Sequence, residues 1–223
     1  MGRVNSGIKG LDHVLDGGFI KGSVNMISGG TGTGKTTFGL QFIFQGLKMG
    51  ETCVYISFEE KPADIKEDAA SFGWDLGSYE KRGLLKVLYY DPAQVNSLSS
   101  ALISELESIS ASRLVLDSIS VTGLAIGNPA EVRKLVSNIV NSIKNHSGCT
   151  ALILSEVGEG SGALSRYGVE EFVADGVILL NYMDSNQNYN RSLMVRKMRR
   201  IKHGKDVYPF EIYSNGISLC KRD

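Results

Sequence analysis

Cysteine is scarce in this sequence and follows no recognisable spacing. The chain has three cysteines, Cys53, Cys149 and Cys220, which stand far apart in mostly apolar, strand-like surroundings. Disulfide frameworks and structural metal sites need paired or clustered cysteines. We therefore predict that these residues are small core side chains in a reducing cytoplasm.

The sequence also lacks an excess of charge and a long apolar run. Its 24 Lys and Arg residues balance its 24 Asp and Glu residues, which argues against a protein dominated by electrostatic attraction to nucleic acid or membrane. No apolar run approaches the roughly 18 residues that a membrane span requires, and residues 1–5 lack the apolar core of a secretion signal. These absences predict a cytoplasmic protein with no membrane partner.

What the sequence does contain is a glycine-rich motif. Residues 29–36 read GGTGTGKT and match G-x-x-x-x-G-K-[ST]. A buried strand is expected before the motif, at 23–27, and an amphipathic helix after it, at 37–47. In this order backbone N–H groups and the helix N-terminus surround a phosphate, while Lys35 reaches the β and γ phosphates and the Thr36 hydroxyl binds Mg²⁺.

Strand-like and helix-like segments alternate along the chain up to about residue 172. Strands are expected at 52–58, 84–89, 113–117 and 150–154, and helices at 62–72, 97–110 and 129–145. Nearly continuous apolar strands are typical of a buried parallel sheet with helices on both faces. Further strands, joined by short polar turns, are expected at 173–182, 191–200, 208–213 and 217–220. The sequence thus predicts one α/β domain over residues 1–223, with a mainly parallel twisted sheet and an antiparallel C-terminal extension.

Two acidic motifs follow strands whose carboxyl ends should meet at one edge of this sheet. Asp117 ends the strand expected at 113–117, where it can hold Mg²⁺ opposite Thr36. Glu59 and Glu60 follow the strand expected at 52–58. Their spacing is equally compatible with a general base that activates water and with a pair that favours the dipole of the next helix.

A basic segment lies near the C-terminal end of the chain, at residues 196–203. On a strand, Lys197 and Arg199 project to one side, and Arg196 and Arg200 to the other. Three interpretations remain open from the residues alone. The segment can contact a γ-phosphate bound to a neighbouring subunit, grip a nucleic-acid backbone, or protect an edge strand against aggregation.

Taken together, several motifs in order resemble the KaiC-type ATPases of the RecA superfamily, specifically their single-domain members. The resemblance covers nearly the whole chain. The matching segments are residues 6–12 (SGIKGLD), the GGTGTGKT loop, 57–60 (SFEE), 71–74 (SFGW), 167–177 (YGVEEFVADGV), Lys197-Met198-Arg199 with His203, and 208–210 (YPF).

The resemblance implies a role for each matching position. ATP would be bound in the loop by Gly30, Thr31, Gly32, Thr33, Gly34, Lys35, Thr36 and Thr37, near its base by Ser71 and Phe72, and by Tyr213 and Ser214. From the adjacent subunit it would be reached by Lys197, Met198, Arg199, Ile201 and His203. Glu59 and Glu60 would be the catalytic carboxylates, with Lys35, Lys197 and Arg199 also catalytic, and Thr36 and Asp117 would hold Mg²⁺. Such proteins are usually hexameric rings with ATP between subunits.

Two departures from the family pattern alter these expectations. Arg200 stands where the family usually has glycine, so the strand can continue there instead of turning, which would displace Ile201 and His203. Glu171 and Phe172 stand where the phosphorylated half of the two-domain clock protein has adjacent Ser and Thr. Autokinase activity is therefore not expected.

Three functions remain open at this point. The first is a slow Mg²⁺-dependent ATPase whose hydrolysis drives a conformational or signalling change, together with an unidentified protein partner. The second is a DNA-binding accessory related to RecA and RadA recombinases, although its loops at 118–128 and 157–168 offer few cations, Arg166 in the second against Glu156 and Glu159. The third is a scaffold that binds ATP without hydrolysing it.

Overall fold

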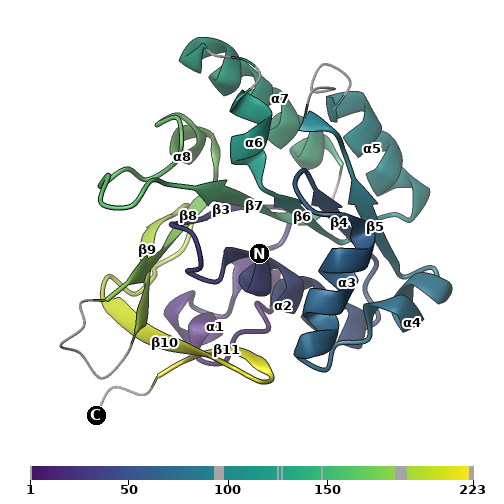
Figure 1. Cartoon of the computed structure of the whole chain (residues 1–223), viewed down its shortest axis with the longest axis horizontal. Coiled ribbons are helices and arrows are strands. Elements are labelled where there is room, and N and C mark those ends of the chain that lie inside the picture. The colour runs from purple at the N-terminus through teal and green to yellow at the C-terminus, as the bar shows by residue number, and fades with distance from the viewer. Residues whose placement is uncertain are drawn as a thin grey trace.

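The computed structural model describes residues 2–92, 98–124, 126, 128–146, 148–183 and 190–220. A nine-stranded sheet forms its centre, in the order β11-β10-β9-β8-β3-β7-β6-β4-β5 (Figure 1). Its strands are β3 (Val24–Gly29), β4 (Cys53–Ser57), β5 (Leu85–Tyr89), β6 (Arg113–Asp117), β7 (Thr150–Glu156), β8 (Gly176–Tyr182), β9 (Arg191–Met198), β10 (Val207–Tyr213) and β11 (Gly216–Leu219). Two short antiparallel strands, β1 (Arg3–Val4) and β2 (Phe19–Ile20), form a separate ribbon.

The strands from β8 to β5 run parallel, whereas β9, β10 and β11 are antiparallel to their neighbours. This confirms the predicted α/β class and the antiparallel extension at the C-terminal side. Parallel neighbours place the carboxyl ends of β3, β4, β6 and β7 at one edge of the sheet, where ligand sites of open α/β sheets form.

Helices cover both faces of the sheet, as predicted (Figure 1). One face carries α1 (Leu11–Val14), α2 (Lys35–Lys48), α3 (Pro62–Ser71) and α4 (Leu76–Lys81); the other carries α5 (Leu98–Ser108), α6 (Ile119–Leu124), α7 (Pro129–Asn145) and α8 (Glu170–Val173). Alternate strand residues supply the two cores, because successive side chains point to opposite faces. Val115 and Leu152 belong to one buried cluster, and Leu114 and Ile153 to the other.

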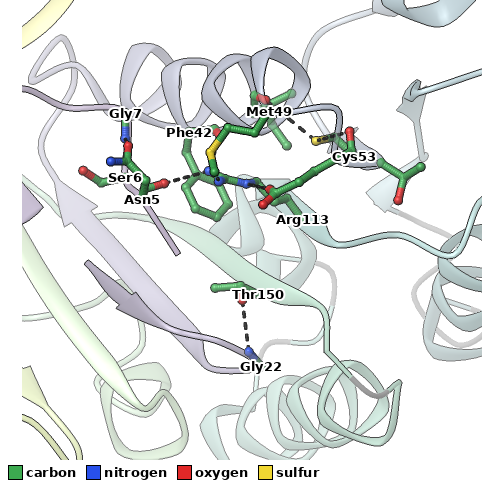
Figure 2. A network of polar contacts seen from close by, with 12 residues as sticks. Asn5, Ser6, Gly7, Gly22, Phe42, Met49, Cys53, Arg113 and Thr150 are labelled. Atoms are coloured by element: carbon green, nitrogen blue, oxygen red, sulfur yellow. Dashed lines mark hydrogen bonds and ion pairs between the residues drawn. The ribbon is translucent and has the colours of Figure 1, made fainter. Parts of the chain in front are cut away.

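A buried arginine at the start of β6 joins distant parts of the chain (Figure 2). The Arg113 side chain is fully buried. Its Nε lies 2.5 Å from Oε2 of Glu51, and its Nη1 donates to the carbonyl oxygens of Asn5 and Phe42, each at 2.8 Å. The guanidinium also stacks over the Phe42 ring, 4.5 Å from its centroid. The N-terminal segment, α2 and the sheet are thus held at one point.

Several element boundaries differ from the sequence predictions. The helix after the glycine motif begins at Lys35, not Thr37. The strand expected from residue 173 begins at Gly176, because Val173 ends α8 and two residues connect that helix to the strand. Part of the loop expected at 118–128 forms α6. The predicted start of α5 at Ser97 lies outside the described residues.

The strand that was expected to continue through Arg200 does not. β9 ends at Met198, and Arg200 takes a left-handed conformation with φ 66°. The backbone N–H of Arg199 donates to the Asp175 carbonyl at 3.0 Å, which fixes the chain as it leaves the strand. The turn that glycine favours is therefore kept although arginine occupies the position.

The prediction that cysteines are core side chains is confirmed for two positions. Cys53 and Cys149 are buried and unpaired, while Cys220 is half-buried. Among the described residues no cluster of His, Cys, Asp and Glu could hold a metal through three such side chains. None of the helices described is long and apolar enough to cross a bilayer.

Candidate functional site

The glycine motif forms a phosphate loop (residues 29–36) between the carboxyl end of β3 and the start of α2. Gly34 caps the helix with φ 100°, a conformation that side chains disfavour. The Gly30 carbonyl accepts hydrogen bonds from Lys35 Nζ at 2.9 Å and from Thr33 Oγ1 at 2.8 Å. The loop is thus already turned for an anion, with the lysine ammonium folded onto its own backbone.

Lys35 lies among carboxylates on the inner side of this loop. Its side chain is largely buried, and burial lowers its pKa from the usual value, while Glu156, Asp117 and Glu59 partly oppose the shift. Removal from water disfavours an isolated ammonium. A phosphate oxyanion at this position would accept a direct, charge-assisted hydrogen bond from the ammonium.

Asp117 at the end of β6 meets Thr36 on the first turn of α2. Its Oδ2 accepts from Thr36 Oγ1 at 2.9 Å and from Tyr55 Oη at 2.6 Å. Burial raises the pKa of Asp117, and the hydrogen bonds from Tyr55 and Thr36 oppose that rise. A hydroxyl and a carboxylate in contact are the hard oxygen ligands that Mg²⁺ prefers, so these residues fit the cation that the sequence implies.

Glu59 and Glu60 follow β4 and are anchored through their backbone. Both backbone N–H groups donate to Ser57 Oγ, at 3.2 and 2.9 Å. Their carboxylates differ in setting. Glu59 Oε1 accepts from Ser118 Oγ at 2.8 Å, whereas the pKa of Glu60 is raised by burial and then by the nearby carboxylate of Asp68, with Asp117, Glu59 and Asp64 adding to it.

A single cleft of about 270 Å³ at the carboxyl edge of the sheet gathers these groups. The residues that line it are Thr31, Gly32, Lys35, Thr36, Ser57, Glu59, Glu60, Asp117 and Glu156. The lining combines an ammonium, three hydroxyls and four carboxylates. Such a set can bind a phosphate together with a divalent cation and can accept a proton from water.

The outer side of the phosphate loop is held by the β8–β9 pair. The Gly32 carbonyl accepts from Tyr182 Oη at 2.8 Å, from Arg191 Nη2 at 3.2 Å and from Arg191 Nε at 3.3 Å. Tyr182 and Arg191 are cross-strand partners, and the guanidinium lies 5.1 Å from the centroid of the tyrosine ring. Two donors from two strands therefore fix the orientation of one loop peptide.

The residues implied near the base lie on two elements beside α2. Ser71 ends α3, where its hydroxyl donates to the Asp68 carbonyl, and Phe72 stacks on Trp74 with ring centroids 4.9 Å apart. Tyr213 is 52% exposed and, with Ser214, lines a cleft of about 800 Å³ between the β10–β11 turn and α2. These pairs are not among the residues that line the 270 Å³ cleft.

Lys197 and Arg199 lie at the opposite edge of the sheet from their own phosphate loop. Met198 pairs with Gly176, and Gly176 with Asn25 near the start of β3, whereas the loop follows Gly29. The offset between Asn25 and Gly29 corresponds to roughly 13 Å along the strands. Their side chains point the same way, as predicted: Lys197 Nζ donates to the carbonyls of Glu171 and Ala174, and Arg199 to that of Phe172.

The strand pattern predicted that Arg200 projects to the side opposite Arg199. In the structure the two side chains lie on the same side. The turn brings Arg199, Arg200 and Lys144 to the same oxygen, Oδ1 of the nearly buried Asp175, at 3.7, 3.7 and 2.9 Å. Three cationic side chains therefore share the single carboxylate of Asp175, and Lys197 lies beside them. We call Lys144, Lys197, Arg199 and Arg200 the basic cluster.

Other residues of the segment face the chain's own core. The Met198 side chain is buried, and Ile201 packs against the core cluster of the α2 face. His203 follows the turn, and its Nδ1 lies 2.8 Å from the Gly204 carbonyl oxygen. The Gly204 N–H donates in turn to the carbonyl of Val14, the last residue of α1. Within the chain, these side chains are not brought to the cleft.

Sequence reasoning missed five residues that shape the site: Tyr55, Ser118, Glu156, Tyr182 and Arg191. Glu156 carried a usable signal, because it is an acid at the end of an apolar strand, as Asp117 is. The roles of the other four depend on which strands are neighbours, and the sequence did not specify that.

Comparisons with known proteins match nearly the whole chain. The family model for the KaiC ATPases matches residues 4–223. A UPF0273 protein of Pyrococcus horikoshii is 35% identical over 232 residues, covering 96% of this chain and 92% of that protein. The circadian clock oscillator protein KaiC of Synechococcus elongatus is 33% identical over 223 residues, covering 95% of this chain and 43% of its own length.

A solved structure shows the same fold. The crystal structure of a KaiC-like protein from the archaeon Pyrococcus horikoshii superimposes with a TM-score of 0.90 at 38% identity, covering 99% of each chain. The sheet and helices described above are therefore those of a RecA-like α/β fold.

Proposed function

Because the chain belongs to the KaiC family of ATPases, we propose that it binds ATP with Mg²⁺ and hydrolyses it slowly to drive a conformational or signalling change. The observation that carries this proposal is the convergence of Lys35, Thr36, Asp117, Glu59 and Glu60 on one cleft beside the phosphate loop. Each supplies a group that phosphoryl transfer to water requires.

Each group has a distinct part in the proposed reaction. The loop N–H groups and Lys35 bind the β and γ phosphates. Thr36 and Asp117 hold the cation, which supplies neutralising charge on the phosphate oxygens when bound. Glu59 or Glu60 orients the attacking water and accepts its proton.

The basic cluster completes the site in this proposal from a second copy of the chain. Lys197 and Arg199 lie too far from their own loop to contact the phosphates bound there, but a neighbouring copy can present them to that nucleotide. Cations placed at the γ-phosphate stabilise the charge of the transition state. We therefore propose a homo-oligomer, a hexameric ring, with ATP at each subunit interface.

Nucleotide binding and turnover are tested separately. Lys35→Ala should weaken ATP binding about 100-fold or more, because the phosphates lose their buried counter-charge. Lys48→Ala, at the exposed end of the same helix, serves as the matched control. Equal ATP affinity in wild type and Lys35→Ala would contradict the proposed phosphate site.

Glu59→Gln combined with Glu60→Gln should leave ATP binding intact and slow phosphate release about 100-fold or more. Glu67→Gln, an exposed glutamate on α3, is the control. Normal turnover by the double variant would remove the general-base role. A wild type that binds ATP but shows no multiple-turnover phosphate release would favour the scaffold function instead.

Assembly is tested by mass from light scattering, with and without Mg-ATP. Wild type should form nucleotide-dependent rings, and Lys197→Ala with Arg199→Ala should lose them or their activity. Arg196→Ala is the control, because Arg196 is exposed on the opposite face of β9. A monomer under all conditions would contradict a site completed in trans, and assembly that needs DNA instead of nucleotide would favour the recombinase-accessory alternative.

A further inference from the structure

Tyr55 is a buried polar residue whose hydroxyl ends at the proposed cation site. It lies in the middle of β4 with no exposed surface. Its ring packs in the core beneath α2, where a Cβ built on Gly39 would lie 3.7 Å from Tyr55 Cε2. A phenylalanine would fill the same ring volume. The hydroxyl therefore adds a polar group that burial disfavours unless it has a partner.

That partner is the carboxylate of Asp117. β4 and β6 are parallel neighbours in which Tyr55 pairs with Val115, so Tyr55 and Asp117 are diagonal neighbours on the face that α2 covers. The separation of Tyr55 Oη from Asp117 Oδ2 is 2.6 Å. A phenol O–H is a single hydrogen-bond donor. At this distance the Tyr55 hydroxyl donates its hydrogen bond to the carboxylate oxygen.

Two donors from different elements act on the same carboxylate oxygen. Thr36 Oγ1 on α2 and Tyr55 Oη on β4 both donate to Oδ2 of Asp117. Among the side-chain hydrogen bonds described for Asp117, neither uses Oδ1, and Asp117 lines the cleft. The two hydrogen bonds therefore restrict rotation of the Asp117 carboxylate about its Cβ–Cγ bond. They leave the other carboxylate oxygen, Oδ1, free of both donors.

We infer that Tyr55 is a positioning residue, which holds the Asp117 carboxylate in the orientation that binds the divalent cation of the nucleotide complex. The inference rests on the proposed function, since it assigns a residue to the same site. Residues that orient a metal ligand commonly change metal affinity about 10–100-fold when they are removed.

The test uses the full-length protein loaded with ATP and Mn²⁺ as the probe, with Mn²⁺ binding followed by electron paramagnetic resonance. Tyr55→Phe should weaken Mn²⁺ binding to the ATP complex about tenfold or more, while ATP binding measured in EDTA stays as in wild type. Tyr90→Phe is the matched control, because it also removes a tyrosine–carboxylate hydrogen bond, to Glu105 on α5. Thermal unfolding of both variants reports any loss of packing.

Equal Mn²⁺ affinity in wild type and Tyr55→Phe overturns the inference, as does an equal loss in Tyr90→Phe. A wild type that binds no ATP at all rejects the proposed function, which is a separate outcome. Should Tyr55→Phe fail to fold, a crystal structure of the wild type with ATP and Mg²⁺ decides the question. A Tyr55 hydroxyl that turns from Asp117 to another acceptor in that complex would refute the positioning role.

Discussion

At the scale of the residue, neighbours decide what identical side chains can do. Glu59 and Glu60 are adjacent and both line the cleft, yet Ser118 holds the carboxylate of Glu59, whereas the pKa of Glu60 is raised by burial and by Asp68. Removal from water and a nearby like charge both disfavour the ionised form of a carboxylate. The two glutamates therefore lie in different surroundings, although the sequence treats them alike.

This difference predicts the acid side of the pH–rate profile. A general base must be ionised, and a raised pKa means that Glu60 takes up its proton at a higher pH than an ordinary glutamate. If Glu60 is the base, kcat should therefore fall, as the pH is lowered, at a higher pH than the usual glutamate value of about 4.3. Asp68→Asn removes a neighbouring negative charge and should shift this limb to lower pH.

Asp64→Asn is the control for that profile, because Asp64 contributes least among the carboxylates that raise the pKa of Glu60. It should shift the acid limb less than Asp68→Asn does. Profiles that coincide for wild type and Asp68→Asn would indicate that Glu60 does not control the rate.

At the scale of the element, the phosphate loop depends on strands that are remote in sequence. Gly34 and the start of α2 shape the loop from within. Its Gly32 carbonyl, however, accepts hydrogen bonds from Tyr182, the last residue of β8, and from Arg191, the first residue of β9. A peptide held by two donors cannot rotate freely, so the N–H of the same peptide is also fixed. The loop is thus partly ordered before any ligand binds.

Loss of this restraint should weaken phosphate binding. Tyr182→Phe combined with Arg191→Gln should lower the affinity for ATP and for ADP about tenfold, since each exposed hydrogen bond contributes about 0.5–1.5 kcal/mol. Isothermal titration measures both affinities. Arg196→Gln on the same strand should leave them unchanged, and wild-type affinities in the double variant would show that the loop needs no support from β8 and β9.

At the scale of the whole molecule, Arg113 joins the N-terminal segment, α2 and the sheet at the edge away from the cleft (Figure 2). Its burial is complete, so removing the guanidinium leaves Glu51 and two carbonyl oxygens without their donor. Unpaired groups of this kind are costly in the interior.

We expect Arg113→Ala to lower the free energy of unfolding by about 3 kcal/mol, measured by urea denaturation. Arg133→Ala, at an exposed position on α7 where the guanidinium lies over the Phe172 ring, should change it by less than about 0.5 kcal/mol. Residual folded Arg113→Ala should still bind ATP, because Arg113 and Asp117 occupy opposite ends of β6. A stability loss as small as that of Arg133→Ala would contradict a central role for Arg113.

The sequence by itself determined the phosphate loop, the acid at the end of β6, the parallel sheet between two helical layers and its antiparallel extension. These depend on local spacing and on apolar periodicity, which a linear pattern records. It also predicted that the side chains of Lys197 and Arg199 point the same way, although Arg199 lies just beyond the end of β9. It misjudged Arg200, because hydrogen bonding to Asp175 ends β9 despite a residue that disfavours the turn.

Beyond the predicted approach of Thr36 to Asp117, only the tertiary structure decided which residues meet. Tyr55 reaches Asp117 because β4 and β6 are neighbours, Ser118 reaches Glu59 from the same pair, and Arg191 reaches Gly32 across β8 and β9. Strand order depends on the total burial of many residues distant in sequence, and no single segment specifies it. The tertiary structure also put Lys197 and Arg199 at the edge opposite their own phosphate loop, which is why the proposed site needs a second copy of the chain.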